Sequence, residues 1–84
     1  MSKKEKLIER LLSRPKDFTF DELVTLMEYL GYQKTNAGRT SGSAVKFIDN
    51  NGYVLFLHRP HPGNILKEYH IKSAISELRE RNLL

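Results

Sequence analysis

The residues best suited to acid–base chemistry in this 84-residue chain are its three histidines, His58, His61 and His70. An imidazole titrates near neutral pH, so it can accept or donate a proton under physiological conditions. His58 and His61 have an i, i+3 spacing that also occurs in metal sites, but Pro60 separates them and the chain has no cysteine and no nearby cluster of carboxylates. The sequence therefore predicts no metal site. His70 falls near the start of a helical segment, where we expect a surface position.

A second candidate for chemistry is the segment from residue 38 to residue 48. Its first half, rich in glycine and serine, predicts a loop, and the residues after it alternate as in a β-strand. Such a loop can hold chemistry at the start of a rigid element. Ser41 and Ser43 carry hydroxyl groups, but no His–Asp pattern accompanies them, so we interpret them as ordinary loop residues rather than nucleophiles.

Basic residues concentrate in the middle of the chain. The net charge is +4, and acidic and basic residues balance both before residue 34 and after residue 72. The whole excess of positive charge lies in residues 34–72, where the only acidic residues are Asp49 and Glu68. The basic residues of this part are Lys34, Arg39, Lys46, Arg59, Lys67 and Lys72. This distribution is typical of a surface that binds a polyanion, of which RNA or DNA is the first candidate. A solvated basic surface without a ligand gives the same pattern.

Length and composition indicate one small domain over residues 1–84, with 39% hydrophobic residues and no repeat or linker. The absence of cysteine excludes disulfides and thiolate metal sites. The charged start of the chain lacks an apolar signal region, and no run approaches the ~18 apolar residues of a membrane span. We therefore expect a cytoplasmic protein without membrane association.

Two helices are predicted before the central segment. The first has a capping box formed by Ser2 and Glu5 and ends before Pro15. The second begins at Thr19, with Glu22 at the capping position, and ends at Gly31. Their apolar stripes are interpreted as core: Leu7, Ile8, Leu11 and Leu12 in the first, Leu23, Leu26, Met27 and Leu30 in the second.

Three strands follow, at about residues 32–37, 43–48 and 53–58, and the segment 49–52 (Asp-Asn-Asn-Gly) predicts a hairpin turn. A turn of two or four residues places odd positions of the second strand opposite even positions of the third. Val45, Phe47, Val54 and Phe56 then form the core face. The other face mixes basic and apolar residues: Ala44, Lys46, Ile48, Tyr53, Leu55, Leu57 and Arg59. This mixture predicts that a partner docks on that face, unless the assignment of the two faces is inverted. On that face Tyr53 is a candidate to stack on a base, with cross-strand packing as the alternative.

A turn rich in proline leads to a last helix from about residue 67 or 68 to residue 81, with a buried stripe of Ile71, Ala74, Ile75 and Leu78. The predicted fold class is α+β in the order α-α-β-β-β-α, a three-stranded antiparallel sheet with helices packed on one face.

From about Thr19 to Leu84 the chain resembles the HicA family, the mRNA interferase toxins of HicA–HicB toxin–antitoxin systems. The resemblance rests on the order and spacing of Leu30-Gly31-Tyr32, Gly42-Ser43, the hairpin, the segment 59–63 (Arg-Pro-His-Pro-Gly) and the closing helix. It implies a fold like that of double-stranded-RNA-binding domains, metal-independent cleavage of mRNA without a cofactor, and a HicB-type antitoxin that covers the active face.

The chain departs from the family at one important position. The family motif is Gly-Ser-His, with a catalytic histidine, and here Gly42 and Ser43 are followed by Ala44. Loss of one acid–base group typically slows a reaction ~10²–10⁴-fold, so we expect this sequence to be catalytically crippled. Two explanations stay open, of which we favour the first: deliberate or selected inactivation, and a natural lineage in which other groups do the work.

The candidate site therefore comprises Ala44, at the position of the family histidine, and His61, which could contact phosphate. The candidate RNA-binding residues are Lys34, Arg39, Ser43, Lys46, Arg59 and Lys67. Two other functions remain possible: a non-catalytic RNA-binding module, and a protein-interaction domain that uses the apolar face of the sheet.

Overall fold

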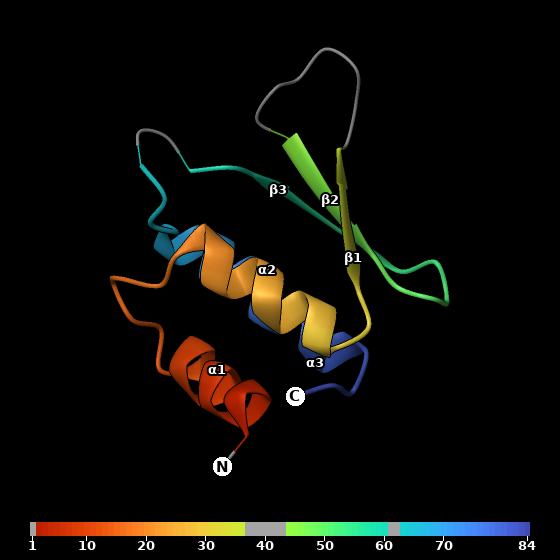
Figure 1. Cartoon of the computed structure of the whole chain (residues 1–84), viewed down its shortest axis with the longest axis horizontal. Coiled ribbons are helices and arrows are strands. Elements are labelled where there is room, and N and C mark those ends of the chain that lie inside the picture. Colours follow the sequence, from red (N-terminus) through yellow and green to blue (C-terminus); the bar gives the residue numbers. More distant parts are fainter. Residues whose placement is uncertain (1, 37–43, 61–62) are drawn as a thin grey trace.

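The computed structural model describes residues 2–36, 44–60 and 63–84, and of Asn36 and Ala44 the backbone alone. Its elements follow the predicted order: α1 (Lys3–Leu12), α2 (Phe20–Tyr29), β1 (Gln33–Asn36), β2 (Ala44–Ile48), β3 (Val54–His58) and α3 (Glu68–Glu80). The strands form one antiparallel sheet in the order β1-β2-β3. Figure 1 shows α2 and α3 on one side of this sheet, with α1 packed against these two helices.

The helix ends are specified by local hydrogen bonds, as the sequence predicts. The Ser2 hydroxyl accepts a hydrogen bond from the Glu5 backbone N–H at 3.1 Å. At the start of α2, Thr19 Oγ1 accepts from the Glu22 N–H, and the Glu22 carboxylate accepts from the Thr19 N–H at 3.0 Å, which completes a capping box. Gly31 follows α2 with a φ of +94°, a conformation that a side chain disfavours.

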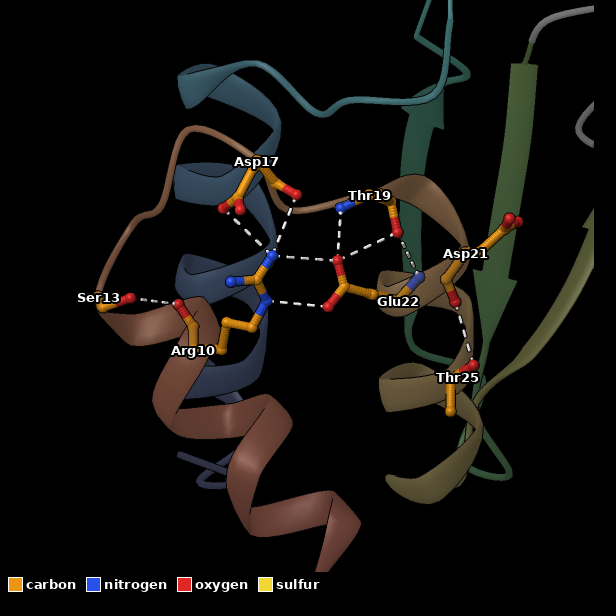
Figure 2. A network of polar contacts seen from close by, with 7 residues as sticks. All are labelled: Arg10, Ser13, Asp17, Thr19, Asp21, Glu22 and Thr25. Carbon is orange, nitrogen blue, oxygen red and sulfur yellow. Dashed lines mark hydrogen bonds and ion pairs between the residues drawn. The ribbon is translucent and has the colours of Figure 1, made fainter.

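Helix α1 is held to α2 by one arginine. The Arg10 guanidinium donates two hydrogen bonds to the Glu22 carboxylate, at 2.9 and 3.3 Å, and one to the Asp17 carbonyl (Figure 2). The hydrogen bonds from Arg10 are the main reason that the pKa of Glu22 lies below its ordinary value. Glu22 thus joins the N-terminus of α2 to the neighbouring helix.

The core lies between the sheet and the helices, and it contains most of the predicted residues. Leu12 is an exception, since its side chain is 39% exposed at the end of α1. The buried apolar residues are Leu11, Phe18, Phe20, Leu23, Leu26, Met27, Tyr32, Val45, Phe47, Leu55, Leu57, Leu66, Ile71, Ala74, Ile75 and Leu78.

The predicted register of the β2–β3 hairpin is wrong. Phe47 pairs with Leu55 and Val45 with Leu57, so odd positions face odd positions. The cause is a three-residue loop: the Asp49 N–H donates to the Tyr53 carbonyl at 3.0 Å, and residues 50–52 lie between them, ending in Gly52 with a φ of +87°. A three-residue loop with its last residue in the left-handed region is a common hairpin connection. Leu55 and Leu57 therefore belong to the core, whereas Phe56 does not.

The segment after β3 is fixed to the start of α2. The Phe20 N–H donates to the Asn64 carbonyl and the Leu66 N–H to the Phe18 carbonyl, both at 2.8 Å. These bonds flank a bridge between Thr19 and Ile65. The end of β3 and the start of α3 are thereby attached to the helical layer, so β3 is anchored at the end where His58 lies.

Candidate nucleic-acid interface

The side of the sheet turned away from α2 and α3 carries a mixed set of side chains. Strand alternation and the observed registers assign seven described residues to this side, which we call the open face: Gln33, Thr35, Lys46, Ile48, Val54, Phe56 and His58. In the sheet, Thr35, Lys46 and Phe56 form one row across the three strands. Phe56 is 63% exposed, the largest value among the exposed large hydrophobic side chains of the described residues.

The electrostatic character of the open face is positive. Lys46 lies on its central strand, and no Asp or Glu occurs among the seven residues. Lys46 also forms no ion pair with any part of the chain that the structure describes. An unpaired ammonium group on a surface without carboxylates attracts anions such as phosphate.

Ala44 is the first residue of β2, and its Cα is paired with that of His58. Its register position lies two residues before Lys46. His58 is exposed at the end of β3. Ala44, at the position where the family motif has its histidine, is thus paired with the exposed His58 on the neighbouring strand.

The predicted RNA-binding residues are not all on one surface. Lys46 lies on the open face, but Lys34 is paired with Phe47, which points into the helical layer. Arg59 follows β3, and its guanidinium carbon lies 5.2 Å from the centre of the Phe20 ring at the start of α2. The assignment of Arg59 to the same face as Lys46 was based on the incorrect hairpin register, so it is wrong as well.

Lys67 precedes α3 and lies in a groove of about 480 Å³ together with Arg14 and Lys16. This groove is formed by the α1–α2 connection and the N-terminus of α3, not by the strands of the sheet. The remaining predicted site residues, Arg39, Ser43 and His61, lie outside the described residues.

Tyr53, expected on the second face, instead packs against the helical layer. The Arg81 guanidinium lies 3.7 Å from the centre of the Tyr53 ring and donates to Glu77 at 3.0 Å. Glu77 in turn accepts from the Tyr32 hydroxyl at 3.2 Å. Burial, followed by the Glu77 charge, raises the pKa of Tyr32 to about 12. These contacts hold the hairpin turn against the end of α3, so Tyr53 is engaged by the protein itself.

Sequence reasoning missed Phe56 and His58 as residues of the open face. The signal that could have identified them is the turn, since Asp49-Asn50-Asn51-Gly52 also fits a three-residue loop that ends in a left-handed glycine. With a three-residue loop, the odd-numbered residues of β3 point into the core, and Phe56 lies on the open face.

His70 is the second surprise, because it is buried rather than on the surface, with 2% of its area exposed. Its Nδ1 accepts a hydrogen bond from the Lys67 backbone N–H at 3.1 Å, which requires this nitrogen to be unprotonated. Its Nε2 is buried without a hydrogen bond among the described residues. Burial, with smaller contributions from the charges of Lys67 and His58, lowers the pKa of His70 below its ordinary value of 6.5, and a contact with the His58 backbone opposes this shift only in part. His70 is therefore a neutral core residue beneath the end of β3.

The described residues contain neither a cluster of metal-ligating side chains nor a membrane-spanning helix. In residues 2–36, 44–60 and 63–84, no group of three or more His, Cys, Asp or Glu is arranged to hold a metal ion. No helix in the same ranges has the length and apolar character needed to cross a membrane.

Comparison with known proteins adds one finding. A family model described as the HicA toxin of bacterial toxin–antitoxin systems matches residues 20–79, which extend from the start of α2 to the last turn of α3. No curated protein and no solved structure shows significant similarity to the chain.

Proposed function

Because the chain belongs to the HicA family of bacterial toxin–antitoxin toxins, we propose that it is built to cleave mRNA as a metal-independent endoribonuclease and thereby to block translation. The observation that carries this proposal is the open face. It combines an unpaired Lys46 on β2 with an exposed Phe56 and an exposed His58 on the adjacent strand β3, and it has no carboxylate among its described residues. A surface of this composition suits single-stranded RNA better than a neutral small molecule.

Cleavage of RNA without a metal uses the 2′-hydroxyl of the substrate as nucleophile. A base removes the hydroxyl proton while the oxygen attacks the adjacent phosphorus, and an acid gives a proton to the 5′-oxygen as its bond to phosphorus breaks. Imidazole is suited to both roles because its pKa lies near neutral pH. A cation beside the phosphate, the role we assign to Lys46, stabilises the negative charge that develops.

Ala44 stands at the position of the family histidine and supplies no proton-transfer group. We therefore propose that the chain keeps its RNA-binding surface and has lost most of its catalysis, by ~10²–10⁴-fold for one missing acid–base group. This fits inactivation of a protein that harms the cell producing it. In the alternative, a natural lineage, groups other than residue 44 perform the proton transfers.

The test is the Ala44→His variant expressed in bacteria. The restored imidazole is expected to arrest growth and reduce intact mRNA, whereas the unchanged chain leaves growth normal. Ala44→Gln is the matched control, since glutamine adds volume and polarity but does not titrate near neutral pH. A folded, soluble Ala44→His variant with no effect on growth or mRNA contradicts the proposal.

A partner follows from the same proposal. The toxin would be neutralised in the cytoplasm by a HicB-type antitoxin that covers the open face. Co-expression of a cognate antitoxin with the Ala44→His variant is expected to restore growth.

A further inference from the structure

We infer that Phe56 is the residue on which a nucleobase of single-stranded RNA stacks. This inference rests on the proposed function and extends it, because it names the group that would hold the substrate by its base rather than by its phosphate. Phe56 lies on edge strand β3, and 63% of its surface is exposed.

The surroundings of Phe56 favour a base over an apolar protein partner. Its cross-strand neighbour is Lys46, and the next residue along that row is Thr35. The residues at the two flanking positions of β3 are the half-buried Val54 and the exposed His58. The Phe56 ring can stack on a base while the neighbouring Lys46 binds the phosphate attached to it, and the described residues of this face include no carboxylate that would repel the phosphate. A protein interface of the same size would be expected to expose several large apolar side chains together.

The other exposed aromatic residues have different surroundings. One side of the Tyr53 ring lies against the Arg81 guanidinium. Tyr29, 47% exposed, lies on α2, and Tyr69, 60% exposed, lies on α3, both outside the open face. Tyr69 therefore provides a matched control for Phe56, because it has nearly the same exposure but lies outside the open face.

The experiment measures binding of the purified chain to a short, labelled single-stranded RNA by fluorescence anisotropy, at several salt concentrations. Phe56→Ala is expected to weaken binding by about 5- to 150-fold, the range for loss of one stacked base. Phe56→Trp is expected to retain the affinity, and Phe56→Leu to lose it, because leucine keeps an apolar side chain but has no π face. Tyr69→Ala is expected to bind as the unchanged chain does.

Salt dependence separates stacking from charge. Phe56→Ala should leave the slope of log K against log salt unchanged, whereas Lys46→Ala should reduce it by about 0.7, the value for one phosphate contact with a single strand. Equal affinities of the Phe56→Ala variant and the unchanged chain overturn the inference, as does full retention by Phe56→Leu. The latter result would show that residue 56 contacts the RNA through its apolar surface rather than by stacking.

The inference and the proposed function fail in distinguishable ways. If Ala44→His cleaves RNA and adding Phe56→Ala changes neither its kcat nor its KM, the function stands and the stacking role is wrong. If Phe56→Ala weakens RNA binding but Ala44→His never cleaves, the stacking role stands and the catalytic proposal is wrong. If the unchanged chain does not bind RNA at low salt, the stacking role is wrong.

Discussion

Protonation of His70 should destabilise the fold as the pH falls. The ring is buried, its Nδ1 must stay unprotonated to accept from the Lys67 N–H, and its Nε2 has no hydrogen-bond partner among the described residues. A proton added to Nδ1 would break that hydrogen bond and place a charge in the core. The charges of Lys67 and His58 also disfavour the charged form of the ring, and a contact with the His58 backbone offsets this only in part.

The sign of the effect follows from the lowered pKa. In the unfolded chain His70 titrates near 6.5, and in the folded chain its pKa is lower. Between these two values the unfolded state binds more protons, so the free energy of unfolding rises with pH. The contribution is fully present above about pH 6.5 and falls below it, by at most about 1.4 kcal/mol per pH unit.

The assay is urea unfolding followed by circular dichroism between pH 5 and pH 8. His70→Gln keeps an oxygen that can accept from the Lys67 N–H but does not titrate, so its stability should depend less on pH than that of the unchanged chain. Parallel curves for His70→Gln and the unchanged chain would contradict this prediction, since they would show that His70 protonates equally well in the folded and unfolded states.

Two further predictions concern the elements that support the open face. Glu22→Ala removes the capping box and the hydrogen bonds from Arg10, and should lower the free energy of unfolding by about 1–2 kcal/mol. The control is Glu28→Ala, which removes an exposed carboxylate from the same helix and should change the free energy of unfolding by less than about 0.5 kcal/mol. Equal effects of Glu22→Ala and Glu28→Ala in urea unfolding would contradict the role of Glu22. Gly52→Ala should destabilise the hairpin by about 1–2 kcal/mol through backbone strain alone, because nothing lies within 4 Å of an added Cβ. Gly52→Asn should cost less, and a neutral Gly52→Ala in thermal unfolding would show that the turn has another conformation.

Helices were predictable from the sequence because their signals are local. The capping box of α2 uses Thr19 and Glu22, three residues apart, and the left-handed Gly31 ends the same helix. Such contacts depend little on the rest of the fold, so the predicted boundaries agree closely with the observed ones.

The hairpin register was not predictable with the same certainty, because a single residue in the turn decides it. The segment 49–52 fits a loop of two, three or four residues, and only the three-residue loop places Leu55 and Leu57 in the core. The predicted open face was therefore partly wrong, and Phe56 was assigned to the wrong side of the sheet.

The position of His70 depended on tertiary packing, which the helical pattern does not reveal. In the sequence it stands beside the apolar stripe of Ile71, Ala74 and Ile75, and its burial results from the layer formed by the helices and β3. The candidate site shows the same limit: Lys46 and Arg59 are both basic, yet one lies on the open face and the other packs on Phe20.

We propose that this fold holds its RNA-cleaving group at position 44. The most direct measurement compares purified Ala44→His with the unchanged chain on an mRNA substrate in the presence of a chelator. We expect the variant to cleave ~10²–10⁴-fold faster than the unchanged chain, without any metal. Equal rates for the two proteins, or no cleavage by a variant that folds and binds RNA, would contradict it.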